Sequence, residues 1–400
     1  MSLQMDGRRK GRLTLAMQVI VLLGLVSLLG DIIYEGARSI TGPYLAVLGA
    51  SAAVVGFVSG IGEFIGYAVR LLSGYLADRT ERYWVMTFLG YGLLVSIPLL
   101  AVAGRWEIAA ILIVTERMGK AIRTPSRDAI LSHATKEVGR GWGFGIHEAL
   151  DQVGAIIGPL IFTVVFILKG SYEQGFALMA IPLILMIIVL FIAMRKAPIP
   201  SKLESEEKND SDDGRNSLPR TFWLYTIFIA LSVLGFAHFQ IISYHMKIES
   251  VVPDAEIPLF YAVAMGIDAA VALLVGRFYD KIGLCTVALI PLLTIPIPFL
   301  AFTTSYIAIL FGTVLWGAVM GVQETIMRAA IADISPLRRR GFSYGVFNTA
   351  YGASWFVGST IIGILYEISI FWIYLLVLAT QILSLVIFYP VVRCRPKQGA

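Results

Sequence analysis

The most regular feature of the chain is the alternation of long apolar runs with short polar segments. Five runs, at 83–103, 175–194, 282–306, 341–366 and 368–392, contain no charged residue. Each reaches the roughly 20 residues that a helix needs to cross the hydrocarbon core of a bilayer. The short alternating strands of a membrane β-barrel do not appear in the pattern. We therefore predict an all-α membrane protein with twelve transmembrane helices, near 14–37, 50–77, 83–104, 107–125, 142–168, 173–195, 221–246, 257–279, 283–303, 305–330, 341–366 and 369–393.

The composition agrees with a location in a lipid bilayer. Hydrophobic residues make up 57% of the chain and charged residues only 15%, where a soluble domain carries about 25% charged residues. The net charge of +5 does not indicate nucleic-acid binding, because the basic residues are distributed among the polar segments and form no single patch.

The distribution of basic residues predicts the topology. If the N-terminus is cytoplasmic, nearly all Lys and Arg residues fall in cytoplasmic loops, and only Arg38, Arg105, Lys169 and Lys247 fall on the opposite side. Cytoplasmic loops of membrane proteins are enriched in Lys and Arg. We therefore predict a multi-pass protein of the plasma membrane with both termini in the cytoplasm.

A polar, acidic segment separates the sixth and seventh predicted helices. It contains few apolar residues to bury, which is typical of a flexible linker. We predict an N-terminal six-helix bundle at 1–196, a flexible cytoplasmic linker at 197–220 and a C-terminal six-helix bundle at 221–400.

The two predicted bundles carry related motifs. The charged stretch from Gly74 to Arg82 is predicted to form a hairpin between the second and third helices, and a similar stretch begins at Gly276. Arg140-Gly141 and Arg340-Gly341 also open similar helices half a chain apart. Six helices in each half give both halves the same orientation, which indicates parallel repeats with a site near the middle of the membrane at their interface.

In these features the chain resembles the major facilitator superfamily over nearly its whole length. That family carries the signature G-x-x-x-D-R-x-x-R between helices 2 and 3 and a weaker copy between helices 8 and 9. The resemblance implies a secondary transporter in which this loop helps to hold the cytoplasmic face closed. The matching residues of the gating motif are Gly74, Asp78, Arg79 and Arg82 in the first half, and Gly276, Asp280 and Lys281 in the second.

Charged residues inside the predicted spans fall mainly in the first half. Such residues are costly in a membrane and mark functional sites by default. Asp31, Glu35 and Arg38 share one face of the first helix through their spacing. Glu63 and Arg70 are two turns apart on the second helix and serve either transport or a structural ion pair. The candidates for proton coupling or substrate binding are Asp31, Glu35, Arg38, Glu63, Arg70, Glu116, Arg117, His147, Glu148 and Asp151.

The fourth helix ends in a series of cations. Arg123 and Arg127 are expected to be anchors at the cytoplasmic membrane surface. The family often carries an arginine in helix 4 that is linked to proton transfer in its antiporters, and the resemblance points to Arg117. Lys120 and Ala121 stand where that motif has Gln-Gly.

The fifth helix aligns His147 and Asp151 with two glycines on one face. Its glycine motif, Gly145, Gly154, Gly158 and Pro159, resembles the signature of the drug/proton antiporter branch of the family, which implies export by antiport. His147, Glu148 and Asp151 are either proton carriers or static partners of the cations in helix 4. We expect at least one of Asp31, Glu35, Glu148 and Asp151 to take up and release protons.

The second half offers polar and aromatic candidates for the substrate pocket. Its spans are mostly neutral, which suggests that ion coupling lies in the first half and that substrate contacts are shared. These candidates are His238, Gln240, Tyr244, Asp268, Trp316, Gln323 and Glu324.

No catalytic motif, metal motif or phosphate-binding loop is present in the sequence, so we predict no enzyme activity, no cofactor and no resident metal. The preferred function is proton-coupled export of a small organic solute by a monomer, through alternating access. Three alternatives remain open: proton-coupled uptake of an organic anion or sugar, held by Arg38, Arg70 or Arg117; metal-ion transport; and a receptor or scaffold without transport activity.

Overall fold

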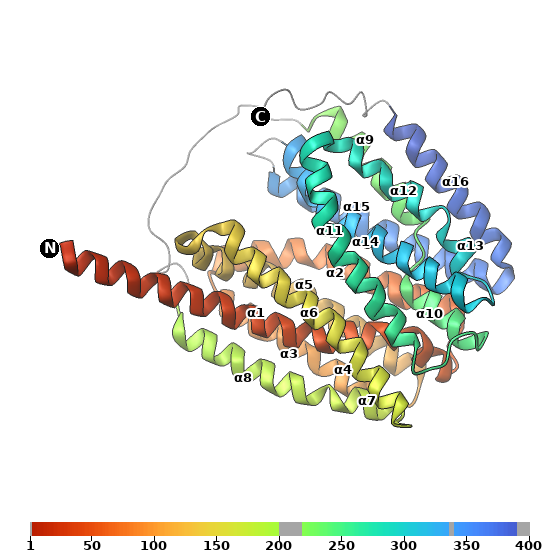
Figure 1. Cartoon of the computed structure of the whole chain (residues 1–400), viewed down its shortest axis with the longest axis horizontal. Coiled ribbons are helices and arrows are strands. Elements are labelled where there is room, and N and C mark those ends of the chain that lie inside the picture. The colour runs from red at the N-terminus through yellow and green to blue at the C-terminus, as the bar shows by residue number, and fades with distance from the viewer. Residues whose placement is uncertain (1, 200–217, 336–339, 390–400) are drawn as a thin grey trace. The chain divides into compact units, whose positions relative to one another are not determined.

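The computed structural model describes residues 2–199, 218–335 and 340–389, and all regular elements in these ranges are helices (Figure 1). Within these ranges, nine stretches are long and apolar enough to cross a membrane. The predicted all-helical membrane fold is therefore confirmed. The number of crossings, the cytoplasmic termini and the linker, most of which lies outside the described residues, remain predictions.

The helices of the first half follow the predicted order. Proline and glycine interrupt the third predicted span, because proline lacks a backbone donor for the helix. The elements are α1 (Ser2–Val47), α2 (Ala52–Thr80), α3 (Tyr83–Gly92), η1 (Leu93–Val95), α4 (Ser96–Leu99), η2 (Leu100–Val102), α5 (Trp106–Val138), α6 (Arg140–Ile167), α7 (Tyr172–Leu178) and α8 (Ala180–Lys196).

The helices of the second half also match the predicted segments. Its third segment is divided into short pieces around Pro291, Pro296 and Pro298. The elements are α9 (Arg220–Leu234), α10 (Phe239–Ile248), α11 (Ile257–Ile282), η4 (Gly283–Ala288), α12 (Leu289–Thr294), α13 (Ile297–Ala301), α14 (Tyr306–Ile334), α15 (Arg340–Ile368) and α16 (Ile370–Phe388).

The chain packs as two compact units. Unit 1 comprises Met1–Ala37, Val69–Gly104 and Ile108–Asp210, and unit 2 comprises Arg38–Ala68, Arg105–Glu107 and Ser211–Ala400. The units therefore divide α1 and α2, whose parts between Arg38 and Ala68 pack with the second half. The predicted domains follow the repeat and the units follow packing, so the two divisions describe different properties.

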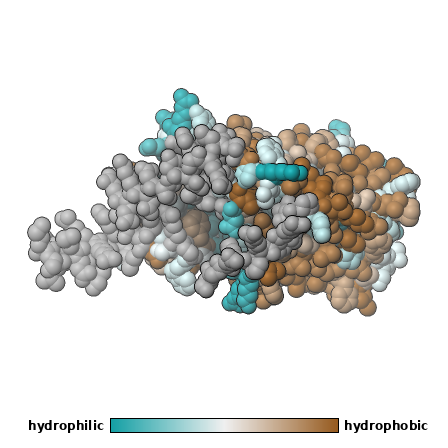
Figure 2. Space-filling view, turned by 90° about the horizontal axis from the view of Figure 1, so that it is seen from above, coloured by the Kyte–Doolittle hydropathy of each residue, from teal (hydrophilic) through white to brown (hydrophobic). Residues whose placement is uncertain are grey.

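Apolar side chains cover much of the described surface, as Figure 2 shows in brown. Leu72, Ile111 and Val386 are more than half exposed. Exposure of such side chains on many helices is unfavourable in water and favourable in lipid, which agrees with the membrane fold.

The stretch predicted as a charged hairpin is mostly helical. α2 continues through Gly74 and Arg79 to Thr80, and the turn is confined to Glu81, with φ of 53°, and Arg82. The motif thus occupies the last two turns of α2, and the side chain of Asp78 lies outside the described residues. The prediction of a hairpin was wrong because charged residues can continue a helix beyond its apolar run.

The seventh predicted span is broken between Leu234 and Phe239. Gly235 ends α9, and His238 precedes α10 with extended backbone. The side chain of Trp316 donates from Nε1 to the carbonyl oxygen of Ala237 at 3.0 Å. Because of the break, the carbonyl oxygen of Ala237 accepts no hydrogen bond within a helix. The bond from Trp316 supplies the donor that a buried backbone carbonyl needs.

Candidate functional site

Two glycines bring α6 against α1 in unit 1. A Cβ atom at Gly154 would lie 2.4 Å from the carbonyl oxygen of Leu28, and one at Gly158 would lie 2.4 Å from that of Ile32. No side chain fits at these distances, so the two helix backbones are in direct contact. Asp151 precedes Gly154 by about one turn, on the face of α6 that meets α1.

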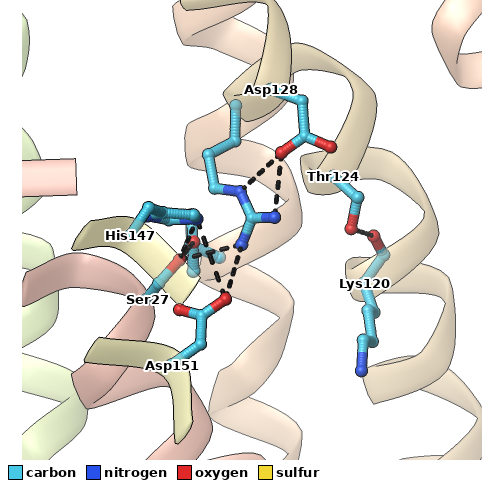
Figure 3. Close-up of polar contacts among 8 residues, drawn as sticks. Ser27, Lys120, Thr124, Asp128, His147 and Asp151 are labelled. Atoms are coloured by element: carbon cyan, nitrogen blue, oxygen red, sulfur yellow. Dashed lines mark hydrogen bonds and ion pairs between the residues drawn. The ribbon is translucent and has the colours of Figure 1, made fainter. Parts of the chain in front are cut away.

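Asp151 joins Ser27, His147 and Arg127 in what we call the unit 1 cluster. Figure 3 shows Ser27, His147 and Asp151 turned toward one another. His147 Nε2 lies 3.7 Å from Asp151 Oδ2 and 3.3 Å from Ser27 Oγ. Arg127 Nη1 donates to Ser27 Oγ at 2.8 Å and lies 3.9 Å from Asp151 Oδ2. The cluster therefore connects α1, α5 and α6.

Arg127 has two carboxylate partners of unequal strength. Its Nε and Nη2 donate to Asp128 Oδ1 at 3.0 and 2.9 Å. Its contact with Asp151 is about 1 Å longer than these, beyond hydrogen-bond distance. Asp128 is 44% exposed and Asp151 only 16%. The guanidinium group therefore binds the outer carboxylate firmly and the inner one weakly.

Ser27, His147 and Asp151 have the residue types of a hydrolase triad but a different geometry. In such a triad the serine and the aspartate contact different nitrogens of the histidine. Here Ser27 and Asp151 both lie nearest to Nε2. The histidine cannot transfer the serine proton with this arrangement, so the geometry does not support acyl-transfer chemistry.

Glu116 lies between two arginines on α5. Its Oε2 is 3.5 Å from Arg117 Nε and its Oε1 is 3.8 Å from Arg123 Nη1. All three side chains are buried. Arg123 also lies over the ring of Tyr91, 5.0 Å from its centroid. Arg123 is directed to Glu116 and Tyr91, and Arg127 to Ser27 and Asp151 as well as Asp128. Their expected role as anchors at the cytoplasmic membrane surface remains a prediction.

Tyr34 of α1 is the meeting point for the inner cations. Arg117 Nη1 donates to its hydroxyl group, and Lys120 Nζ lies 3.9 Å from its ring centroid. Arg117 also lies over this ring, 4.5 Å from its centroid, so each of the two cations makes a cation–π contact with Tyr34. The sequence carried no signal for Tyr34, because an aromatic residue in an apolar span is more often packing.

The helix 1 carboxylates interact with this array. Asp31 has electrostatic interactions with Asp151 and Lys120, and Glu35 interacts with Lys120. Glu35 is buried, whereas Glu148, the sequence neighbour of His147, is exposed. The structure therefore brings together most first-half candidates but leaves Glu148 outside the cluster.

A second polar group, which we call the unit 2 cluster, consists of Arg38, Glu63 and His238. Arg38 Nη2 donates to Glu63 Oε1 at 3.2 Å, and His238 Nε2 lies 3.6 Å from the same oxygen. All three side chains are buried. The imidazole also packs on the ring of Trp355, with centroids 4.7 Å apart. Two first-half candidates and one second-half candidate thus meet within unit 2.

The other second-half candidates have mixed environments. Tyr351 donates to Gln323 Oε1 at 2.9 Å, and a Cβ atom at Gly42 would lie 2.0 Å from the carbonyl oxygen of Gln240. Asp268 is buried, and Glu324 is exposed.

The motif glycines make equivalent contacts in the two halves. A Cβ atom at Gly74 would lie 3.5 Å from Pro125 on α5, and one at Gly276 would lie 3.7 Å from Thr325 on α14. These are ordinary van der Waals distances, so both positions have room for a methyl group. Asp280 and Lys281 are exposed, and Arg79 donates to the hydroxyl of Tyr75 at 3.5 Å.

Comparison with known proteins establishes the family. The model of the Major Facilitator Superfamily matches residues 20–284 and 249–399. The chain belongs to this superfamily. It is therefore a multi-pass membrane protein of a family of secondary transporters, and its function is the movement of a solute across a membrane.

Relatives in the superfamily extend over nearly the whole chain. An uncharacterized protein of Mycobacterium tuberculosis (strain ATCC 25618 / H37Rv) is 42% identical over 381 residues, which cover 94% of this chain and 93% of the relative. An uncharacterized MFS-type transporter of Methanocaldococcus jannaschii is 29% identical over 88% of this chain and 89% of its own. Among solved structures, a mutant of the nucleoside transporter NupG has a TM-score of 0.74 at 12% identity, covering 94% of this chain and 100% of that one. That likeness concerns the fold alone.

Proposed function

We propose that the protein is a proton-coupled exporter of a small organic solute, with the proton site in the unit 1 cluster. The observation that carries the proposal is the position of Asp31 beside the unit 1 cluster: its Cβ atom lies 3.1 Å from where a Cβ atom of Gly154 would stand, about one turn of α6 from Asp151. Both carboxylates lie on helices that are long and apolar enough to cross a membrane. Two ionised carboxylates in one buried cluster repel each other, and the uptake of one proton removes this repulsion. The contacts of Gly154 and Gly158 with α1 hold the two carboxylates close to each other. With no side chain between the helices at these positions, the backbones of α1 and α6 are in direct contact.

Asp151 is the carboxylate that we infer to exchange the proton. Its Oδ1 has no hydrogen-bond partner within the part of the chain that the structure describes, and the same is true of His147 Nδ1. A neutral Asp151 would lose its attraction for Arg127, which already has a firmer partner in Asp128. Proton binding would thereby weaken the connection between α5 and α6, which gives protonation a structural effect.

The cations of α5 favour this function over uptake of an organic anion. The four cations of α5, Arg117, Lys120, Arg123 and Arg127, interact with five carboxylates, namely Glu116, Asp128, Asp31, Glu35 and Asp151. An anion-binding site needs positive charge in excess of its own carboxylates. Within the described residues, no group of three or more His, Cys, Asp or Glu side chains is placed to hold a metal ion, so transport of a metal ion has no observation in its favour.

Transport in proteoliposomes tests the proposal. Compounds that raise the melting temperature of the purified protein are first identified and then offered to vesicles with an imposed pH gradient. For an exporter that exchanges solute for protons, we expect solute to enter vesicles that are acidic inside. Asp151→Asn should abolish gradient-driven movement, and Glu173→Gln, an exposed carboxylate on α7, should not. Solute entry driven by acid outside the vesicles would establish uptake. Full gradient-driven activity of both Asp151→Asn and Asp31→Asn would show that the proton does not bind at this cluster.

A further inference from the structure

An antiparallel contact joins α2 to α15 within unit 2. A Cβ atom at Gly56 would lie 2.2 Å from the carbonyl oxygen of Ser359, and one at Gly60 would lie 2.8 Å from the Cα atom of Phe356. At the start of α2, the backbone N–H of Ala53 donates to Glu367 Oε1 at 2.8 Å. We call this contact the α2–α15 seam. It is continuous with the unit 2 cluster, because His238 packs on Trp355 of α15.

The seam joins parts of the chain that belong to different repeats. α2 and the end of α1 come from the first half, and α15 and α10 come from the second. Alternating access requires the two halves to separate on each side of the membrane in turn. The seam must therefore open once in every transport cycle, and any charges buried in it must tolerate that opening.

We propose that Glu63 is the centre of a latch on this seam, with Arg38 as its permanent partner and His238 as its releasable one. The proposal rests on the proposed transport function, since only a transporter has to open the seam. Arg38 and Glu63 lie in one continuous segment, 38–68, whereas His238 lies in the break between α9 and α10. Separation of the halves leaves the first contact intact and breaks the second.

The distances agree with these two roles. Arg38 makes a hydrogen bond of 3.2 Å to Glu63 Oε1, while His238 Nε2 stands 3.6 Å from that oxygen. A carboxylate left alone in a membrane is very unfavourable. Because Arg38 stays with Glu63, opening the seam uncovers no unpaired charge. His238 likewise keeps its packing on Trp355, so each side of the latch remains stable when open.

Opening of the seam can be measured through a buried position within it. Ser359 is 0% exposed and its side chain has no hydrogen-bond partner in the described part of the chain, so Ser359→Cys is nearly isosteric. The full-length variant in lipid nanodiscs is treated with a charged maleimide, and modification at position 359 is followed by mass spectrometry of its peptide. The rate of modification reports how often the seam opens.

In this background, His238→Gln should raise the rate about tenfold, which corresponds to the loss of an electrostatic contact of about 1.4 kcal/mol between the imidazole and the carboxylate. Glu63→Gln alone removes the carboxylate that accepts a hydrogen bond from Arg38 and is expected to lower the yield of folded protein. The double variant Arg38→Gln with Glu63→Gln removes both charges, so it should fold and should label as fast as His238→Gln. Adding His238→Gln to the double variant should then change nothing.

His245→Gln is the matched control. His245 is a second buried histidine of unit 2, and its nitrogens meet the hydroxyl of Tyr366 and the carbonyl oxygen of Thr303, both in the second half. Its replacement should leave labelling at position 359 unchanged. An unchanged rate in His238→Gln, or a further tenfold increase when His238→Gln is added to the double variant, would overturn the latch. Labelling needs no substrate, so it tests the latch even if the vesicle assay finds no proton coupling.

Discussion

Gly158 in unit 1 and Gly358 in unit 2 stand half a chain apart and make the same contact. A Cβ atom at Gly158 would lie 2.4 Å from the carbonyl oxygen of Ile32, and one at Gly358 would lie 2.3 Å from that of Leu234. In the first case α6 packs on α1, and in the second α15 packs on α9. The two stretches with similar sequence motifs therefore make similar backbone contacts.

The side chains around these two contacts differ. Near the first lie Asp151, Arg127 and their partners, whereas the second lies on a helix with Tyr351 and Trp355 and their aromatic neighbours. The same backbone contact thus accommodates different side chains around it. In unit 1 it lies beside the charged unit 1 cluster, whereas in unit 2 the aromatic residue Trp355 separates it from the Arg38–Glu63 pair, because Trp355 packs on His238.

Substitution of Gly158 or Gly358, which make the matching backbone contacts, should lower the stability of the protein more than the other changes considered. Gly158→Ala and Gly358→Ala each force a methyl group against a carbonyl oxygen, and each should lower the free energy of unfolding by about 3 kcal/mol. Thermal melting of purified protein in detergent measures the loss. Gly145→Ala and Gly266→Ala, where no atom lies within 4 Å, serve as controls. A tolerant Gly358→Ala beside a damaging Gly158→Ala would show that the two contacts are not equivalent.

The next effect concerns the buried charges of α5 in unit 1. Glu116→Gln removes the carboxylate between Arg117 and Arg123, which should cost about 2 kcal/mol, less than is usual for a broken buried ion pair, because Tyr34 and Tyr91 still contact the two guanidinium groups. The comparison is made by thermal melting with Glu107→Gln, an exposed glutamate at the start of the same helix, whose melting temperature should match the parent protein. Equal melting of both variants would mean that the charge array is not essential to stability.

The smallest effect should come from a neutral polar pair in unit 2. Tyr351→Phe removes the hydrogen bond to Gln323 Oε1, for which a loss of about 1 kcal/mol is typical. The stacked contact of the ring with Phe347 and its edge-to-face contact with Tyr67 are kept. If this variant melts as low as Glu116→Gln, the polar pair contributes as much as a buried charge network, and the contrast between the units would not hold.

Most helices of this fold can be predicted from the sequence because apolar runs in a membrane have few alternatives to helical structure. The break before His238 could not be predicted in this way. Its freed carbonyl at Ala237 is satisfied by Trp316, on another helix, and such a long-range partner leaves no local signal. The end of α2 was missed for the opposite reason, since a charged stretch was interpreted as a turn where the helix continues.

Part of each candidate site was also accessible from the sequence. Spacing placed Asp151 on the same face as Gly154 and Gly158, and the structure has these glycines against α1. Partners on other helices could not be deduced. Arg38 shares a helix face with Asp31 in the sequence, yet its observed hydrogen bond is to Glu63 of α2. Likewise, Arg127 was identified only as a cation near the cytoplasm, because its inward direction depends on Ser27 and Asp151.

The pairing of Arg38 with Glu63 has an electrical consequence. Moving one elementary charge through a potential of 100 mV changes its energy by about 2.3 kcal/mol. Two opposite charges that move together on one segment, 3.2 Å apart, transfer no net charge through the field. A displacement of this pair as one body is thus electrically silent, so the membrane voltage does not act on that movement.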